Sequence, residues 1–351
     1  MSGGTAVVLF NLGGPDRLTA VEPFLYNLFR DPAIIRLPNP FRWALAKYIS
    51  VKRAPLSREM YAALGGGSPL VPLTEAQGRA LKTALSDLGR VEVAVAMRYW
   101  HPFADAAVEA VKRFDPDRIV LLPLYPQYST TTSASSLKDW HRAARAAGLN
   151  KPTVSVCCYP REPGFIQAQA RLVMTALDQA VAVAPGARPR VLFSAHGLPK
   201  KIVDDGDPYQ VHVEATAKAI AAAAGIADGD YVVCYQSKVG RLEWLGPDTE
   251  HEIHRCGTDG VAAVVVPIAF VSEHSETLFE LDIDYRSKAE AAGVPAYIRV
   301  PAVGTEPEFI EGLARLVRDA CGNAVSDMVS AEGGRFCPGT CRRCAMAEKG
   351  L

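Results

Sequence analysis

Short apolar runs recur along the chain, and stretches with helical periodicity separate them. The runs are rich in β-branched residues, which favours buried strands. We predict strands at residues 6–10, 91–97, 118–122, 153–157, 190–194, 231–235, 262–266 and 296–300. Helical patterns fill the gaps, for example at 74–88, 104–114, 164–183, 211–224 and 306–321. Alternating strands and helices predict an α/β protein with parallel sheets flanked by helices.

The eight runs fall into two sets of four with similar exits. AVVLFNLGGP in the first set resembles RVLFSAHGLP in the second, and IVLLPLYPQYS resembles AVVVPIAFVSEH. We therefore expect an internal duplication: two similar doubly wound lobes, each with a parallel four-stranded sheet, and a cleft between them. The division that we expect is an N-terminal lobe at 1–165, a C-terminal lobe at 166–322 and a cysteine-bearing tail at 323–351.

Residues 24–55 break this pattern. The segment FLYNLFRDPAIIRLPNPFRWALAKYISVKRAP is rich in aromatic and aliphatic residues and ends in basic ones, and its prolines oppose a single long helix. It is typical of a hydrophobic lip over a cleft, or of a surface that rests on a membrane. A helical hairpin packed into the core is the alternative.

Composition excludes several classes of protein. The chain has 351 residues, of which 49% are hydrophobic and 22% charged, and Lys plus Arg equals Asp plus Glu at 38 each. A net charge of zero lacks the excess of basic residues that is typical of nucleic-acid-binding proteins. We see no signal peptide and no apolar run of about 18 residues, so we expect a cytoplasmic protein. Its eight cysteines then indicate reduced thiols or metal ligands rather than disulfides.

An acidic stretch follows the apolar run at 262–266. Glu273, Glu276, Glu280 and Asp284 are spaced so that an α-helix would carry them on one face, and His274 stands at their start. A row of carboxylates beginning at a histidine suits a cation path or a proton relay. The alternative is a solvated acidic face, because carboxylates are favoured in the first turn of any helix.

Polar side chains gather where the predicted strands end. His196 follows one strand directly, with a glycine after it, and it parallels His274 in the same lobe, which favours a catalytic role over a structural one. Other polar exits are Asn11, Arg98, Tyr99, Tyr125, Tyr128, Gln236 and Lys238. In doubly wound sheets, ligands bind at the carboxyl ends of the strands.

Two glycine-rich turns could let the backbone approach a ligand. Residues 11–15, NLGGP, lack the G-x-G-x-x-G spacing, and the chain has no P-loop, so we do not expect nucleotide binding. Residues 65–69, GGGSP, form the second turn and bring Ser68 into the set of candidate substrate contacts.

The tail carries Cys337, Cys341 and Cys344 with C-x3-C-x2-C spacing, which indicates a metal or cluster site. A fourth ligand is needed. The candidates are Cys157, Cys158, Cys234, Cys256 and Cys321. Cys157 and Cys158 lie at a strand exit and are the best donors. The alternative is a frayed tail with unligated thiols.

NLGGP, LYPQYS, SAHGLP, YQSKVGRLEWLGP and PIAFVSEHSETLFELD occur in an order that resembles the ferrochelatase family, from about residue 7 to 317. The resemblance implies two Rossmann-like lobes and an enzyme, a lyase, that inserts Fe²⁺ into protoporphyrin IX in the last step of haem synthesis. Coproporphyrin III as substrate, or a non-enzymatic tetrapyrrole or metal carrier, are the alternatives. A homodimer and peripheral contact with the inner membrane are both compatible with this resemblance.

The resemblance also implies roles for residues. His196 and Glu276 would meet the metal and the pyrrole protons, and His274, Glu280 and Asp284 would lead away from them. The substrate-binding set is Leu12, Ser68, Arg98, Tyr99, Tyr128 and Trp244. Ser68 and Tyr128 are included because they lie in a glycine-rich turn and after a predicted strand, and not because of a family motif. Residues 24–55 would be the family's lip.

This chain departs from the family at two places. Some members carry arginine where it has Ala62 and Ala63, so propionate contacts there are not expected. Animal members hold a [2Fe–2S] cluster with a different cysteine spacing and a fourth cysteine in the loop where this chain has Thr130. A [2Fe–2S] cofactor is still expected, held by the three tail cysteines and Cys158, with Cys157 the second choice.

Overall fold

The computed structural model describes residues 3–238, 240, 242–323 and 327–347. The chain divides into two compact units. Unit 1 runs to Cys158 and also takes Leu313–Gly333, whereas unit 2 consists of Tyr159–Gly312 and the tail from Gly334. These packing units do not test the domain division predicted from the sequence, which stays a prediction.

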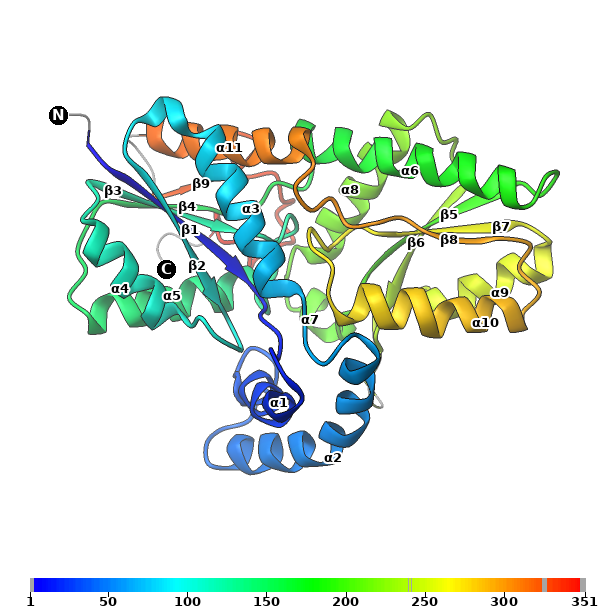
Figure 1. Cartoon of the computed structure of the whole chain (residues 1–351), viewed down its shortest axis with the longest axis horizontal. Helices are drawn as coiled ribbons and strands as arrows, with labels where there is room; N and C mark the ends of the chain where they lie inside the picture. The colour runs from blue at the N-terminus through cyan, green and yellow to red at the C-terminus, as the bar shows by residue number, and fades with distance from the viewer. Residues whose placement is uncertain (1–2, 239, 241, 324–326, 348–351) are drawn as a thin grey trace. The chain divides into compact units, whose positions relative to one another are not determined.

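Unit 1 is built on a parallel sheet with the order β2-β1-β3-β4-β9. Its strands are β1 (Thr5–Asn11), β2 (Val91–Met97), β3 (Arg118–Pro123), β4 (Thr153–Val156) and β9 (Met328–Val329). One face is covered by α4 (Ala104–Phe114) and α5 (Ser133–Ala146), and the other by α3 (Leu70–Ala84) and α11 (Pro307–Gly322) (Figure 1). The short 3-10 helices η1 (Leu18–Ala20) and η2 (Ser86–Leu88) complete the unit's connections.

Unit 2 repeats the plan with the order β6-β5-β7-β8, again all parallel. Its strands are β5 (Pro189–His196), β6 (Tyr231–Gln236), β7 (Ala262–Pro267) and β8 (Tyr297–Arg299). The helices are α6 (Pro163–Val183), α7 (Lys200–Asp204), α8 (Tyr209–Ala223), α9 (Thr249–Asp259), η3 (Glu276–Asp284) and α10 (Tyr285–Ala291). Side chains of α9, α10 and η3 pack in one core cluster with those of the strands, and α6 and α8 lie on the opposite face (Figure 1).

The eight predicted strands all form, and the first four strands of each unit follow the same spatial order. This agreement confirms the two-lobe α/β fold and supports the duplication. One strand was not predicted. The backbone N–H of Cys157 donates to the carbonyl of Val329 at 2.7 Å, so part of the tail joins β4 as β9. The first sheet therefore has five strands instead of four.

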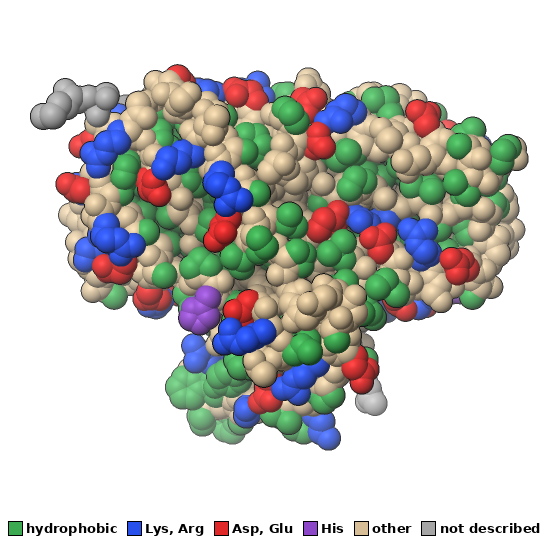
Figure 2. Space-filling model, in the orientation of Figure 1, with side chains coloured by type: hydrophobic (Ala, Val, Ile, Leu, Met, Phe, Trp, Pro, Cys, Tyr) green, Lys and Arg blue, Asp and Glu red, His purple; other side chains and the backbone are tan. Residues whose placement is uncertain are grey.

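The segment 24–55 forms most of two helices, α1 (Val21–Arg30) and α2 (Phe41–Ala63). The prolines between them separate the helices as predicted, but Pro55 does not stop α2, which continues through it. α1 packs against Ala54 and Tyr61 of α2. The segment is therefore a helical hairpin, and the side on which its two helices face each other is buried. On the other side large apolar residues are exposed, and Figure 2 shows them gathered where α1 and α2 project.

No helix in the described part of the chain combines the length and apolar character that crossing a membrane requires.

Candidate active site

His196 is the last residue of β5, and its ring lies beside the loop that follows β7. β5 is paired with both β6 and β7, so the chain switches direction across the sheet at this point, where α/β sheets bind their ligands. The ring nitrogen Nδ1 of His196 lies 2.8 Å from Oε2 of Glu276. Nε2 of His196 has no hydrogen-bond partner among the described residues and is the atom that can meet a ligand.

Glu276 begins η3, which is a π-helix rather than the predicted α-helix. π-Helices are rare and occur often at functional sites, and their hydrogen bonds span one residue more than those of an α-helix. The wider turn brings Glu276 and Glu280 to one side chain, Ser237. Oγ of Ser237 lies 2.6 Å from Oε2 of Glu280 and 3.4 Å from Oε2 of Glu276.

Ser237 has a positive φ of 64°, a left-handed conformation that is uncommon for a residue with a side chain. In this conformation its backbone N–H also donates to Oε1 of Glu280 at 3.0 Å. Tyr285 donates its hydroxyl to the same oxygen at 3.0 Å. Glu280 is thus fixed by three donors, and a strained backbone at this place is typical of a site that needs one geometry.

The four carboxylates do not form the single row that the sequence predicts. Glu273 accepts from Arg299 at 2.7 Å, and Asp284 pairs with Lys288 at 3.0 Å. The α-helical spacing behind the prediction does not hold in a π-helix. Basic residues pair with the two outer carboxylates: Arg299, 26 residues from Glu273, and Lys288, four residues from Asp284. Only Glu276 and Glu280 remain with His196.

The charges of this group are strongly coupled. Burial lowers the pKa of His196, but the neighbouring carboxylate of Glu276 outweighs burial and raises it above the ordinary value. Burial would raise the pKa of Glu276, yet the charge of His196 and its hydrogen bond hold it well below the usual range. Burial and the charge of Glu276 raise the pKa of Glu280. Each member of the His196–Glu276 pair thus favours the charged form of the other, next to a second carboxyl group, Glu280, whose pKa is raised.

His274 is buried just before η3. The backbone N–H of Glu276 donates to its Nδ1 at 3.0 Å, and its ring meets Phe270 edge to face. Burial lowers the pKa of His274, so the ring is neutral near pH 7. Its contacts position the start of η3, and a part in proton transfer stays a prediction.

Two aromatic residues support His196. The hydroxyl of Tyr209, in the first turn of α8, donates to the backbone carbonyl of His196 at 3.0 Å. Trp244 bridges to Pro199, and its ring lies so close to Gly197 that an added Cβ would meet it at 3.1 Å. A side chain after His196 would be crowded by this indole and by the backbone oxygen of Gln236, which the added Cβ would meet at 3.0 Å.

In unit 1 the predicted pair Arg98 and Tyr99 converges on a residue that the sequence did not single out, Asp31. Arg98 Nη2 lies 2.7 Å from Oδ2 of Asp31, and the hydroxyl of Tyr99 lies 3.0 Å from the same oxygen. Ser135 donates to it at 2.5 Å. Asp31 is buried at the end of α1, so it fixes both side chains from the helical hairpin.

The other predicted substrate contacts lie in the same unit. The carbonyl of Leu12 accepts from the N–H of Tyr99 at 2.9 Å, which joins these two residues. The N–H of Ser68 donates to the carbonyl of Pro15 at 2.7 Å, so the GGGSP loop packs on the NLGGP turn. Tyr128 is buried after β3. Substrate binding by these residues remains a prediction.

Comparison with known proteins decides the family. A model of the ferrochelatase family matches residues 4–321. A ferrochelatase of Caulobacter vibrioides is 50% identical over 346 residues, which covers 98% of this chain and 97% of the relative. A ferrochelatase of Phenylobacterium zucineum is 49% identical over 351 residues, covering 98% of each chain. The chain belongs to the ferrochelatase family.

A solved structure, that of SirB from Bacillus subtilis with Fe³⁺, has a TM-score of 0.52 and 11% identity to this ferrochelatase. The match covers 92% of this chain and 97% of SirB. At that identity the likeness concerns the fold alone, and it agrees with the two parallel sheets described above.

The tail cysteines of this ferrochelatase lie together in unit 2. Cys337, Cys341 and Cys344 are buried in one cluster with Val211, Met346 and Ala347, whereas Cys158 is the last residue of unit 1. All eight cysteines are described, and none of them forms a disulfide. No three His, Cys, Asp or Glu side chains in the described residues are arranged to hold a single metal ion.

Three residues of the site gave no signal in the sequence. Ser237 is a small polar residue in a loop, Asp31 lies in a segment interpreted as a surface, and Arg299 ends a short strand. Each acts through a partner far along the chain. A search for charged residues at strand ends could have found Arg299, but no local pattern distinguishes the other two.

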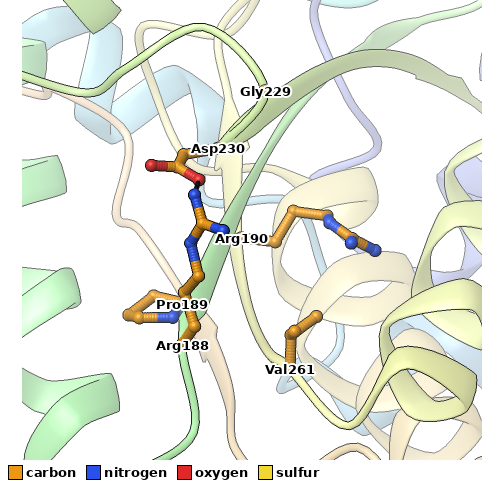
Figure 3. A pocket seen from close by; sticks show the side chains of 6 residues that line it. All are labelled: Arg188, Pro189, Arg190, Gly229, Asp230 and Val261. Carbon is orange, nitrogen blue, oxygen red and sulfur yellow. Dashed lines mark hydrogen bonds and ion pairs between the residues drawn. The ribbon is translucent and has the colours of Figure 1, made fainter.

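A small hollow at the amino ends of the strands of the second sheet is a poor candidate for the site. It is lined by residues at the amino ends of β5 and β7 and before β6, namely Arg188, Pro189, Arg190, Gly229, Asp230 and Val261 (Figure 3). Arg188 turns toward Asp230 and pairs with it. Parallel sheets bind ligands at the carboxyl ends of their strands, where His196 lies.

Proposed function

We propose that this ferrochelatase inserts Fe²⁺ into protoporphyrin IX, releasing two protons, at the group formed by His196, Glu276 and Glu280. The observation that carries the proposal is the 2.8 Å contact between His196 and Glu276 at the carboxyl ends of β5 and β7, with Nε2 of His196 open to a ligand. A base and carboxylates at one point suit a reaction that removes two pyrrole protons as a cation enters.

The proposed order of proton transfer follows from the charges. His196 must be neutral to accept a pyrrole proton, and Glu276 then stabilises the imidazolium that forms. Glu280 lies on the same side of η3 with a raised pKa, so it suits the next position of a departing proton. The negative charge of Glu276 also favours approach of the divalent substrate ion.

We propose that the porphyrin is held by Arg98, Tyr99, Leu12, Ser68 and Tyr128 of unit 1 and by Trp244 of unit 2. The network around Asp31 supports part of this set, because a guanidinium and a phenol fixed by one buried carboxylate can meet a ligand without losing much side-chain freedom. His274 would assist by holding η3.

We propose further that the tail carries a [2Fe–2S] cluster on Cys337, Cys341 and Cys344. The donors fit, because three buried thiols form one cluster in the described tail, and thiolates are the ligands of such clusters. A cluster shares its ligands between two irons, so it does not need three donors directed at one ion. When bound, it would supply one-electron redox chemistry and a covalent link between turns of the tail.

A cytoplasmic location with peripheral contact to the inner membrane is the third part of the proposal. None of the eight cysteines forms a disulfide, which suits a reducing compartment. On α2, Phe41 and Leu56 are 68% and 73% exposed, and basic residues stand between them. Apolar side chains interleaved with cations are typical of helices that lie on anionic lipid.

The test is an anaerobic assay of Fe²⁺ insertion into protoporphyrin IX, with coproporphyrin III as the second substrate. We expect turnover with protoporphyrin in the wild type, and loss of at least 100-fold in His196→Ala, the scale of a lost general base. His254→Ala is the control, because His254 is exposed on α9 of the same unit.

Faster turnover with coproporphyrin III than with protoporphyrin IX would make coproporphyrin III the assigned substrate. Tight porphyrin binding without metallation in the wild type would indicate a carrier and contradict the proposal.

A further inference from the structure

Asp31 follows α1 and is the acceptor at the centre of a network inside unit 1. Its Oδ2 accepts from Nη2 of Arg98 at 2.7 Å, from the hydroxyl of Tyr99 at 3.0 Å and from that of Ser135 at 2.5 Å. Its Oδ1 accepts from the backbone N–H of Ala33 at 2.8 Å. The side chain of Asp31 is only 3% exposed, so salt and solvent do little to screen its charge.

Arg98 is the cation that faces this carboxylate. Its Nε donates to Oγ of Ser135 at 2.7 Å, and its guanidinium carbon lies 5.0 Å from the centre of the Tyr99 ring. The side chain is 20% exposed. The remaining nitrogen, Nη1, has no hydrogen-bond acceptor among the described residues, so its N–H groups can meet a ligand.

The charges of this network cancel. Arg98 and Asp31 neutralise each other at 2.7 Å. Burial raises the pKa of Tyr99 well above its ordinary value, and the charge of Asp31 acts in the same direction, so the phenol is uncharged. Asp139 lies 4.0 Å from Arg98 but pairs more closely with Arg142, at 2.8 Å. The exposed face of Arg98 is therefore a hydrogen-bond donor without an excess of positive charge.

Apolar side chains adjoin this donor. Leu12 packs against the core cluster that contains Tyr99 and Trp100. A neutralised guanidinium beside apolar walls suits an uncharged group, because a carboxylate placed there would lack a cation of its own. Protoporphyrin IX carries vinyl groups at the positions where coproporphyrin III carries its additional propionates. This difference between the two porphyrins is one that such a surface can distinguish.

From this arrangement we propose that Asp31 is a positioning residue that sets the choice between the two porphyrins. By cancelling the charge of Arg98, it makes this part of the binding set accept the vinyl groups of protoporphyrin IX and disfavour the added propionates of coproporphyrin III. The inference rests on the proposed function, in which Arg98 and Tyr99 meet the porphyrin. Without the charge of Asp31, Arg98 becomes an unpaired guanidinium, which binds carboxylates strongly.

The test compares the full-length wild type with Asp31→Asn. For each porphyrin, kcat/KM of Fe²⁺ insertion and the Kd of the metal-free porphyrin are measured without oxygen. We expect Asp31→Asn to raise the preference for coproporphyrin III over protoporphyrin IX about tenfold, the scale of one hydrogen bond to a charged group. Asp105→Asn is the control. It removes an exposed carboxylate of the same unit, 63% exposed, and leaves the preference unchanged.

Arg98→Gln gives the reciprocal test, which also serves if circular dichroism shows that Asp31→Asn loses its fold. It leaves the charge of Asp31 without its cation, so the preference for coproporphyrin III falls below that of the wild type. The double variant Asp31→Asn with Arg98→Gln has neither charge, and its preference returns toward the wild-type value. An Asp31 that only supports the fold would weaken both porphyrins equally and give no change of sign.

Contrary results are distinguishable. An unchanged or lower preference for coproporphyrin III in Asp31→Asn, in a protein whose wild type metallates protoporphyrin IX, would overturn the inference and leave the proposed function in place. A wild type that prefers coproporphyrin III would overturn both the inference and the proposed substrate. Binding of both porphyrins without metallation, with the preference in Kd still shifted by Asp31→Asn, would contradict the proposed reaction and support the role of Asp31.

Discussion

At the scale of single residues, the site centres on two side chains in direct contact, His196 and Glu276, 2.8 Å apart. His196 and Glu276 shift each other's pKa in opposite directions because each stabilises the other's charged form. Ser237 is uncharged, and its hydroxyl contacts the carboxylates of both Glu280 and Glu276, so it holds Glu280 beside Glu276. The balance of these groups sets the pH at which His196 becomes a base.

Glu276→Gln tests this balance. Glu276 raises the pKa of His196 above its ordinary value, so neutral His196 accumulates only as the pH rises through that raised pKa. Removing the carboxylate leaves burial as the main influence, which lowers the pKa. We expect the acid limb of the profile of kcat/KM against pH to move to lower pH, with a lower plateau.

Glu250→Gln is the matched control, because Glu250 pairs with Lys288 away from the site. An acid limb that stays in place in Glu276→Gln, or moves to higher pH, would show that His196 is not the base that the profile reports.

At the scale of elements, η3 depends on one cation. Arg299 ends β8 and binds Glu273 and Asp282, each at 2.7 Å. Its side chain is only 11% exposed. One carboxylate lies before the π-helix and the other inside it, so Arg299 ties both parts to the sheet. Like charges crowd this segment, and a neutralising partner is needed for its geometry.

We expect Arg299→Met to destabilise the protein by about 2 kcal/mol, because it leaves the partly buried Glu273 without its cation and leaves Asp282 with only Arg286, at 3.6 Å. The value lies below that of a fully buried pair because solvent screens part of the charge. Urea unfolding measures it. Lys288→Met removes the two partly exposed ion pairs of Lys288, with Glu250 and Asp284, and should cost about 0–1 kcal/mol. Equal losses in both variants would contradict a special role for Arg299.

The comparison of elements also shows what the sequence can predict. The strands were found because buried parallel strands are continuous apolar runs, and His196 and the two glutamates were found because strand exits and charge spacing are local signals. The π-helix was not, since its residues also satisfy an α-helical spacing. β9 has two residues and no apolar run. Asp31 was missed because its partners lie 67 or more residues away.

At the scale of the whole molecule, the chain passes between the two packing units more than once. It leaves unit 1 after Cys158, returns at Leu313 and leaves again after Gly333. The tail therefore contributes β9 to unit 1 and the cysteine loop to unit 2. The first unit also carries α2, whose exposed apolar residues face no described partner in that unit.

α2 supports a prediction about lipid. Phe41, Tyr48 and Leu56 are spaced by seven and eight residues, about two turns each, so they share one side of the helix. We expect the wild type to sediment with anionic vesicles, and Phe41→Ser with Leu56→Ser to reduce binding at least tenfold while activity on dissolved porphyrin persists.

Met174→Ser with Val183→Ser is the control, since both residues are exposed on α6 of the other unit. Equal binding of the two double variants would show that α2 is not the lipid contact.

The first turns of α8 have one further consequence. Tyr209 holds the backbone of His196, and His212, three residues later, touches Cys337. Residues three apart lie on the same side of a helix, and a helical turn bends little. Tyr209 and His212 therefore connect the backbone of His196 and the cysteine loop to the same side of α8. We therefore expect oxidation of the tail cysteines to disturb the first turns of α8 and, through Tyr209, the backbone of His196.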